Sequence, residues 1–306
     1  MKQILVTDTL FIFDEHEARL AKAGYKVVRV EKPDSTEEEL IKHIKGKVGY
    51  ILGGIETITE PVIKRADELQ AIVFTGTGWE GYISGWQKAK EQGIKIGRTP
   101  YANIYEVAEW GVASTLAMQR NLFELGPNGT KTFSTVTSLP DLTVGIVGLG
   151  HIGRQYADMM SALGAKEVMY WSRKEKDAPY GYASFEELFS SCDIIFVSVG
   201  DAAGKKFIGK DKLDLMKDNA LIVSISHKGV IDERHLAELL KNKKVRAAMD
   251  IVKEQDLFEG ISPRSWYGSN SSAAYNSSSF LHRASDMAVD TLINLLETGE
   301  DKNRVV

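Results

Sequence analysis

Gly148, Gly150 and Gly153 stand in the spacing GxGxxG, after an apolar run and before an amphipathic one. In such a turn the first glycine permits a tight bend, the second lets the backbone approach a pyrophosphate, and the third allows close helix–strand packing. The N-terminus of the following helix offers free N–H groups to the negative charge. The spacing therefore predicts a dinucleotide site, the alternative being an ordinary tight turn between a strand and a helix.

The end of the next predicted strand bears on the choice between NAD and NADP. A carboxylate at this place binds the ribose hydroxyls and repels a 2′-phosphate. The sequence instead has Ser172 followed by Arg173 and Lys174. A hydroxyl and two cations suit a phosphate through hydrogen bonding and charge pairing. We expect NADP(H) to be preferred over NAD(H), unless the two cations belong only to a solvated turn.

The elements that position these residues alternate between short apolar runs and amphipathic stretches, which is typical of parallel sheets wound with helices. Strands are expected at residues 3–6, 26–30, 48–52, 71–74, 142–147, 168–171, 194–199, 220–225 and 245–250. Helices are expected at residues 15–23, 36–44, 60–66, 103–122, 152–163, 231–240 and 281–298. Ser35, with Glu38 three positions on, fits a capping box. Both halves of the chain are thus predicted to be α/β.

The stretch SNSSAAYNSSS at residues 269–279 is rich in serine and asparagine. This composition is typical of a flexible loop or of a linker between domains. It separates the last predicted strand from the C-terminal helix.

Composition sets limits on the class of protein. A length of 306 residues allows about two domains, and 43% hydrophobic with 26% charged residues fits a folded core. The net charge of −4 disfavours binding to nucleic acid. The sequence contains no run of 18 apolar residues, so no membrane span is predicted. A single cysteine, Cys192, excludes an intramolecular disulfide, and the histidines show no metal-ligand spacing. We expect a cytoplasmic protein without a metal site.

Five segments, one of which contains the glycine motif, follow one another in a characteristic order along the chain. They are FTGTGWEGYI, NIYEVAEWGVASTLAMQR, GLGHIG, ALIVSISHKGVIDERHL and AAMDIVKEQ. Taken together they make the chain resemble the D-2-hydroxyacid dehydrogenase family, which includes phosphoglycerate dehydrogenases and glyoxylate/hydroxypyruvate reductases. The resemblance covers nearly the whole chain.

This resemblance implies a Rossmann dinucleotide-binding domain at residues 99–280, inserted into a flavodoxin-like substrate domain made of residues 1–98 and 281–306. It also implies a small-molecule substrate and a homodimer. The first segment corresponds to the family's substrate loop, with Thr77, Gly78 and Trp79 as substrate-binding candidates. The resemblance also adds cofactor-binding candidates to the glycines and to the residues that follow the next strand. These are His151, Ile152, Val199, Gly200, Ile225 and Asp250, and the resemblance implies that Asp250 contacts the nicotinamide carboxamide.

The family's chemistry rests on an arginine, a glutamate and a histidine, and all three positions are replaced here. Alignment through residues 229–232 puts His227 at the arginine's position. The glutamate's position falls on Gln255, or on Glu254 if one residue is skipped. Ser271 takes the histidine's position. Serine has no pKa suited to proton delivery, and an imidazole cannot give the bidentate clamp of a guanidinium.

Two functions remain open on this basis. The first is an NADP(H)-dependent oxidoreductase with a non-standard substrate, for example an iminium, which already carries positive charge. His227 is then the leading candidate for acid or substrate contact, with Tyr275 and Lys228 behind it. The second is a dinucleotide-binding protein without turnover, acting as a redox sensor or as a subunit of an assembly.

Overall fold

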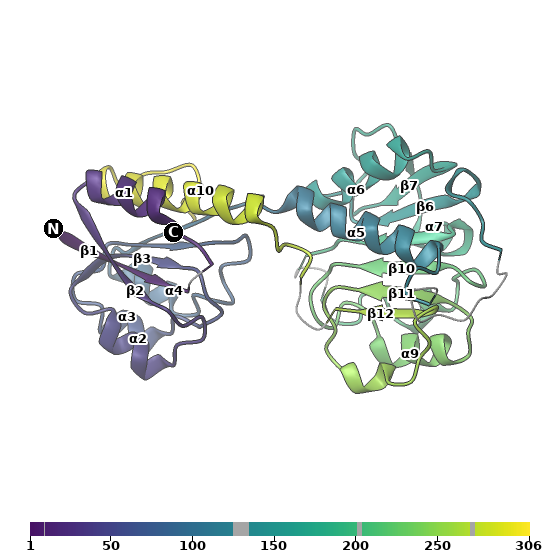
Figure 1. Ribbon diagram of the computed structural model, residues 1–306, viewed down its shortest axis with the longest axis horizontal. Coiled ribbons are helices and arrows are strands. Elements are labelled where there is room, and N and C mark those ends of the chain that lie inside the picture. Colours follow the sequence, from purple (N-terminus) through teal and green to yellow (C-terminus); the bar gives the residue numbers. More distant parts are fainter. Residues whose placement is uncertain (9, 125–134, 201–203, 270–272) are drawn as a thin grey trace. The chain divides into compact units, whose positions relative to one another are not determined.

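The computed structural model describes residues 1–8, 10–124, 135–200, 204–269 and 273–306. The chain forms two compact units, one of Met1–Ala102 with Ser277–Val306 and the other of Asn103–Asn276. Each unit is an α/β layer structure with its own parallel sheet (Figure 1). The predicted fold class is therefore confirmed.

The first unit contains a five-stranded sheet in the order β2-β1-β3-β4-β5, with every neighbouring pair parallel. This is the strand order of flavodoxin-like folds. Its strands are β1 (Lys2–Thr7), β2 (Tyr25–Val30), β3 (Lys47–Leu52), β4 (Ala71–Phe74) and β5 (Lys95–Arg98). Its helices are α1 (Asp14–Lys22), α2 (Glu37–His43), α3 (Glu60–Lys64), α4 (Trp86–Glu91) and α10 (Ser278–Glu297).

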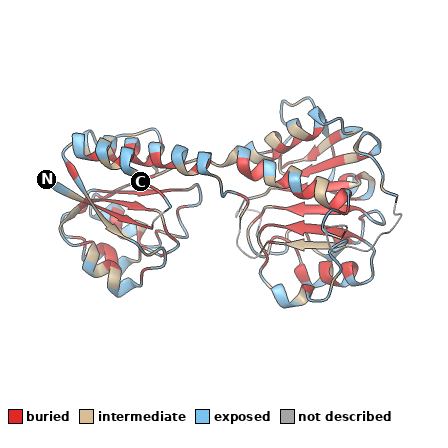
Figure 2. Cartoon of the chain, in the orientation of Figure 1, coloured by how far each residue is buried: buried red, intermediate tan, exposed pale blue. Residues whose placement is uncertain are grey.

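Helices cover both faces of this sheet. Leu20 of α1 and Leu292 of α10 pack with Ile4 and Val6 of β1 in one apolar cluster. Residues of α2, α3 and α4 form a second cluster against the opposite face. Figure 2 shows the buried strands between the helices, whose outward sides are exposed. Burial on both faces explains why these strands are nearly continuous apolar runs.

The second unit contains a seven-stranded sheet in the order β12-β11-β10-β9-β6-β7-β8, again with every neighbouring pair parallel. Its first six strands in chain order follow the Rossmann arrangement, in which the order reverses beside the first strand. The strands are β6 (Thr143–Val147), β7 (Glu167–Trp171), β8 (Gly181–Tyr182), β9 (Ile194–Val197), β10 (Leu221–Ser224), β11 (Arg246–Met249) and β12 (Trp266–Gly268).

Helices of the second unit also form two layers. One cluster joins α5 and α6 to the sheet and includes Tyr156, whose ring stacks on Phe196 of β9 at 3.8 Å. The other cluster joins α7, α8 and α9 to the opposite face. The helices are α5 (Ile104–Gln119), α6 (His151–Ala162), α7 (Phe185–Ser191), α8 (Lys210–Leu213) and α9 (Glu233–Lys241), with 3-10 turns η1 (Leu139–Asp141) and η3 (Gln255–Phe258).

One local prediction is wrong, and another is corrected only at its last two residues. The capping box before α2 uses Thr36 and Glu39, not Ser35 and Glu38, because Thr36 N donates to Glu39 at 2.8 Å and Glu39 N donates to Thr36 at 3.3 Å. The serine-rich stretch contains the boundary between the two units, after Asn276, as expected of a linker. Its last two residues begin α10, and the Ser277 hydroxyl caps that helix by accepting from Phe280 N at 3.0 Å.

Candidate cofactor site

The predicted cofactor residues lie along the carboxyl edge of the second sheet. Strand register pairs Val147 with both Trp171 and Val197, and pairs Ser224 with both Val197 and Met249. The residues that follow these strand ends therefore form one row across the sheet. This row consists of Gly148, Ser172, Ser198, Ile225 and Asp250. The carboxyl edge beside the point where strand order reverses is where α/β sheets bind ligands.

The glycine turn after β6 has the geometry that the spacing predicts. Gly148 has a φ of 97°, and a Cβ there would lie 2.8 Å from the carbonyl oxygen of Ser198. A Cβ on Gly153 would lie 2.1 Å from the carbonyl oxygen of Gly148. By contrast, nothing lies within 4 Å of a Cβ built on Gly150. The first and third positions thus require glycine for the fold, whereas the second faces open space.

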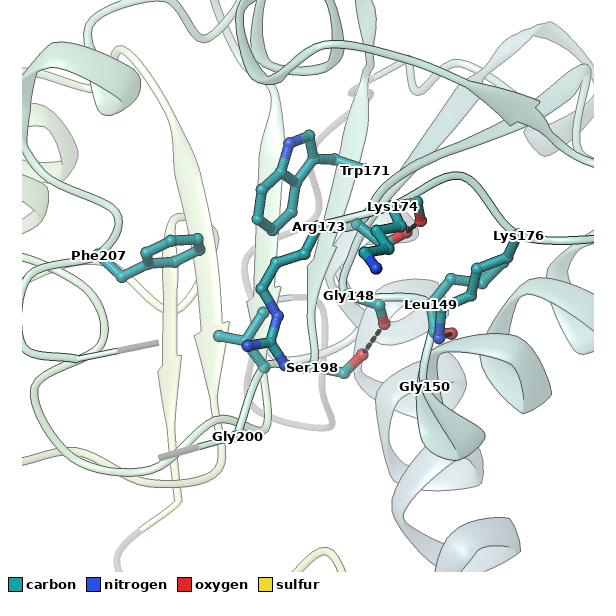
Figure 3. Close-up of a pocket in the computed structure, with 12 residues that line it drawn as sticks. Gly148, Leu149, Gly150, Trp171, Arg173, Lys174, Lys176, Ser198, Gly200 and Phe207 are labelled. Carbon is teal, nitrogen blue, oxygen red and sulfur yellow. Dashed lines mark hydrogen bonds between the residues drawn. The ribbon is translucent and has the colours of Figure 1, made fainter. Parts of the chain in front are cut away.

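Helix α6 starts directly after this turn. Gly150 is its N-cap, and His151 and Ile152 are its first two residues. Its first turn contains no acidic residue, so no side chain there neutralises the positive end of the helix dipole. The Ser198 hydroxyl donates to the Gly148 carbonyl at 2.8 Å and joins the turn to the end of β9 (Figure 3). The helix N-terminus is available to an anion at this edge.

A cavity of about 580 Å³ opens over this turn. Seven predicted cofactor residues line it, namely Gly148, Gly150, Ser172, Arg173, Lys174, Val199 and Gly200. His151, Ile152, Gly153, Ile225 and Asp250 belong to the same edge but are not among its lining residues. None of the residues lining the cavity in the described part of the chain is acidic.

The loop after β7, residues 172–176, is held in one conformation by hydrogen bonds. The Tyr170 hydroxyl accepts from Lys176 N at 2.8 Å and donates to Lys176 O at 2.9 Å. Lys176 Nζ donates to the carbonyl of Leu149 at 2.7 Å, and the Tyr182 hydroxyl donates to the carbonyl of Ser172 at 3.1 Å. These contacts make the loop an ordered wall of the cavity and argue against a merely solvated turn.

The side chains on this wall differ in how they are engaged. Ser172 is buried and its hydroxyl donates to the carbonyl of Lys174 within the loop. Arg173 extends past Trp171 toward Ser198 in the cavity (Figure 3). Within the described residues, no carboxylate lies within 4.0 Å of the charged nitrogens of Arg173 or Lys174, so their charges face the cavity without an ion pair.

Five cavity residues were not predicted from the sequence, namely Leu149, Trp171, Lys176, Ser198 and Phe207. The rings of Trp171 and Phe207 lie 5.5 Å apart and form an aromatic side of the cavity. Such a surface suits a flat heterocycle. Lys176 could have been found as the third cation after β7, but Phe207 comes from a distant loop and has no local signal.

The replaced catalytic positions show no common arrangement. His227 lies between β10 and α9, half-buried, with its Nδ1 shielded from solvent. Gln255 is exposed at the start of η3. Glu254, the alternative at that position, forms an ion pair with Arg234 at 2.5 Å. Ser271 lies outside the described residues, and Tyr275 is 36% exposed.

Asp250 is buried and holds the loop that leads to Tyr275. Its Oδ1 accepts from Ala274 N at 3.1 Å. Burial raises the pKa of Asp250, while hydrogen bonds from the backbone of Ala274 and Ala273 and from the Ser269 side chain oppose that rise. This carboxyl group therefore fixes the chain after β12 in addition to any contact with a ligand.

The predicted substrate residues belong to the first unit, after β4. Thr77 and Gly78 are exposed, whereas Trp79 is buried and meets Trp86 edge-on at 6.1 Å. The aromatic ring of Trp79 thus packs in the core, and the exposed residues of the loop are Thr77 and Gly78.

Two further kinds of site are absent from the described residues. No helix there combines the length and the apolar character needed to cross a membrane. Nor do three or more histidine, cysteine or acidic side chains come together there as ligands for a metal ion.

The second unit matches a known family. Residues 114–265 match the model described as "D-isomer specific 2-hydroxyacid dehydrogenase, NAD binding domain". The hydroxypyruvate reductase of Thermotoga maritima is 30% identical over 69% of this chain and 71% of its own length. The D-3-phosphoglycerate dehydrogenase of Methanocaldococcus jannaschii is 32% identical over 83% of this chain, which spans about half the length of that enzyme.

A solved structure shares the whole fold. It is described as an acyclic imino acid reductase (Bsp5) in complex with NADPH and D-Arg, and it aligns over 100% of both chains with a TM-score of 0.85. At 19% identity the likeness concerns the fold alone. Together with the family match and the relatives, the glycine turn and the two parallel sheets establish that the chain belongs to the D-isomer specific 2-hydroxyacid dehydrogenase family.

Proposed function

We propose that this protein is an NADP(H)-dependent oxidoreductase with an altered catalytic constellation. The observation that carries the cofactor preference is the ordered, cationic wall of the cavity after β7. Arg173, Lys174 and Lys176 line the cavity there, and no acidic residue lines it in the described part of the chain. A 2′-phosphate gains charge-assisted hydrogen bonds from such a wall. A carboxylate in the same place would repel it.

The remaining parts of the cavity suit the rest of a dinucleotide. The open space at Gly150 lets a pyrophosphate approach the backbone at the N-terminus of α6. Trp171 and Phe207 offer an apolar surface to the adenine. When bound, the nicotinamide supplies or accepts the hydride. The chain's own residues bind and orient the cofactor at the carboxyl edge of the sheet.

The substrate is proposed to be a small molecule other than a simple 2-oxo acid. With His227, Gln255 and Ser271 at the family's catalytic positions, the usual guanidinium clamp and glutamate-supported histidine are absent from these positions. An iminium needs no acid during hydride transfer, because its C=N group already carries a positive charge and hydride addition to the carbon gives a neutral amine. The imino acid reductase of the same fold is an example of such chemistry in another protein. His227 is the proposed acid or substrate contact, with Tyr275 and Lys228 as the next candidates.

A second candidate function is favoured by the two residues that align with the family's catalytic glutamate. Gln255 is a neutral, exposed amide, and Glu254 is engaged with Arg234. Neither supports an imidazolium. A dinucleotide-binding protein without turnover, acting as a redox sensor or assembly subunit, would show this combination of retained cofactor residues and lost acid chemistry.

The two functions are separated by binding and turnover measured on the same preparation. NADPH binding is followed by fluorescence, and NADPH oxidation at 340 nm with glyoxylate, hydroxypyruvate, other keto acids and cyclic and acyclic imines. Turnover of an imine supports the reductase, whereas tight NADPH binding with no turnover supports the sensor. Ordinary rates with glyoxylate would contradict the altered constellation.

Variants test the cationic wall itself. Arg173→Ala combined with Lys174→Ala should weaken NADPH binding by about 10- to 100-fold and leave NADH binding unchanged, since charged hydrogen bonds are worth roughly 1.5–3 kcal/mol. The matched control is Lys166→Ala combined with Lys241→Ala, which removes two exposed cations elsewhere in the same unit. An equal loss for both nucleotides would show that the wall supports the fold and not the phosphate.

The homodimer and the cytoplasmic location expected from the sequence also remain proposals. Light scattering coupled to size-exclusion chromatography tests the first, and cell fractionation tests the second.

A further inference from the structure

His227 begins a tight turn that is attached on both sides to walls of the cofactor cavity. Val230 N donates to the His227 carbonyl at 3.4 Å and closes a turn of four residues. Gly229, the third residue of the turn, has a φ of 83°. A type II turn requires a positive φ at this place, which glycine adopts without strain. The backbone at His227 is therefore defined by this turn.

On the side before His227, the attachment is the hydroxyl group of Ser226. It accepts from Val199 N at 3.0 Å and donates to the Val197 carbonyl at 3.3 Å. Ser226 is only 3% exposed, so water competes little for these hydrogen bonds. Val199 itself lines the cavity. The residue before His227 is thus bonded directly to the cavity wall.

On the side after His227, the turn is attached to the loop that carries Phe207. Lys206 N donates to the Gly229 carbonyl at 2.6 Å, and Lys206 Nζ pairs with Asp232 at 3.0 Å. Because the lysine side chain is 63% exposed, the backbone hydrogen bond is the stronger of these two contacts. Phe207 follows directly and lines the cavity.

A dinucleotide in the cavity would therefore contact the walls that hold both sides of the turn. Packed protein interiors transmit such displacements, because they contain little free volume. The attachment after His227 is made mainly by backbone atoms. The attachment before it is made by a side chain, so the identity of residue 226 decides whether it exists.

We propose that Ser226 is a positioning residue that couples occupation of the cofactor cavity to the placement of His227. It acts through the backbone of the turn and has no contact of its own with the reacting atoms. This inference rests on the proposed function, in which the cavity binds NADP(H) and His227 contacts the substrate. It adds to that function a reason why the side chain at residue 227 adopts its working position when the cofactor is bound.

The test follows the imidazole ¹H–¹³C resonances of His227 in the full chain as NADPH is added. Saturation with NADPH should shift them in the wild type, because both attachments of the turn border the cavity. Ser226→Ala should weaken NADPH binding by about 2- to 10-fold, as expected from loss of a neutral hydrogen bond to the cavity wall. At saturation, the His227 shift of this variant should be about half of the wild-type shift or less, since one of two attachments is lost.

Ser191→Ala is the matched control, since it removes a half-buried hydroxyl that donates to the Glu187 carbonyl in the same unit. It should change neither the affinity for NADPH nor the shift of His227. The proposal is overturned if bound NADPH leaves the His227 resonances of the wild type unshifted, or if Ser226→Ala shows the full wild-type shift.

Amide hydrogen exchange without cofactor separates this inference from the proposed function. In Ser226→Ala, exchange at Val199 and Val230 should be about tenfold faster, whereas exchange at Ile222 in the core of β10 should be unchanged. Faster exchange of all three amides by the same factor would indicate a general loss of stability and would overturn the proposal. Failure of NADPH to bind would contradict the proposed function, and exchange at Val230 would still decide whether Ser226 positions the turn.

Discussion

Glycine has a different role at each of three positions in the turn after β6. Gly148 adopts a positive φ, Gly153 lies against the carbonyl of Gly148, and Gly150 borders empty space. The first two roles concern folding and the third concerns the ligand. Substitution by alanine therefore separates stability from binding within one motif.

Gly153→Ala should destabilise the chain by about 2–3 kcal/mol, because the new Cβ meets a backbone oxygen at 2.1 Å and the helix must shift. Gly150→Ala should cost less than about 1 kcal/mol, the usual range for alanine at an N-cap. Its methyl group would nevertheless occupy the space proposed for the pyrophosphate and weaken NADPH binding at least about tenfold. Urea unfolding and NADPH titration of both variants check this. Equal stability of the two variants would refute the assignment.

Among single residues, the sequence predicts those site residues whose role depends only on their neighbours along the chain. The glycine spacing and the Ser172-Arg173-Lys174 run are local, and the cavity is lined by Gly148 and Gly150 of the first and by all three residues of the second. Phe207 and Ser198 were not predicted because tertiary structure brings them to the cavity. The capping box was predicted one residue early because Ser35 and Thr36 both precede a glutamate at the right distance. Burial of Ser35 leaves the exposed Thr36 as the cap.

Helix α9 is tied to η3 by a buried carboxylate. Glu233, which is 5% exposed, accepts hydrogen bonds from Lys253 N at 3.0 and 3.1 Å and from Glu254 N at 2.8 Å. This contact sets the backbone position of Glu254 and of Gln255 beside it. The segment carrying the replaced glutamate is thus positioned by α9.

Glu233→Gln should cost about 2 kcal/mol of unfolding free energy, because an amide NH₂ group would face a backbone donor in place of a carboxylate oxygen. Glu238→Gln on the same helix should change stability by no more than about 0.5 kcal/mol, since its side chain is 71% exposed. Chemical denaturation measures both. A Glu233 variant as stable as the Glu238 variant would show that the hydrogen bonds to Glu233 do not contribute to the free energy of unfolding.

A second buried carboxyl group follows the end of β3. Glu56 is 4% exposed and accepts from the Tyr50 hydroxyl at 2.7 Å. Burial raises its pKa above the ordinary value of 4.5. The ionised form is therefore less stable in the folded chain than in the unfolded chain. The contribution of the Glu56 carboxyl group to the free energy of unfolding is fully present below pH 4.5. It is lost as the pH rises through the raised pKa of the folded chain.

Glu56→Gln removes that ionisation and keeps an acceptor for Tyr50. The stability of the variant minus that of the wild type should grow more positive as the pH rises from about 4 toward neutrality, and then level off. Glu60→Gln should show the opposite trend, because the hydrogen bond from Lys64 lowers the pKa of Glu60. Urea unfolding at a series of pH values measures both. A flat or falling difference for Glu56→Gln would contradict the assigned shift.

Among the elements, the long ones were predicted within a few residues and several short ones were missed. β8 and β12 contain two and three residues at the edges of the second sheet. Their pairing partners stabilise them, and such short segments have no periodicity of their own. α4, α7 and β5 were also not predicted, because four to seven residues give too weak a pattern.

For the molecule as a whole, the alternation of strands and helices predicts two parallel sheets, and the structure confirms them. The order of strands within each sheet does not follow from composition or periodicity. It came from the family resemblance, which the comparisons support. Net charge was also uninformative about the cofactor, because a chain with a net charge of −4 concentrates three cations on one wall of its cavity.

The most direct test of the account is the ratio of dissociation constants for NADPH and NADH on the unmodified chain, measured side by side at one ionic strength. The two nucleotides differ only in the 2′-phosphate, which the wall of Arg173, Lys174 and Lys176 is proposed to bind. NADPH should bind at least about tenfold more tightly than NADH, as expected from one charge-assisted hydrogen bond. Equal or tighter binding of NADH would contradict it.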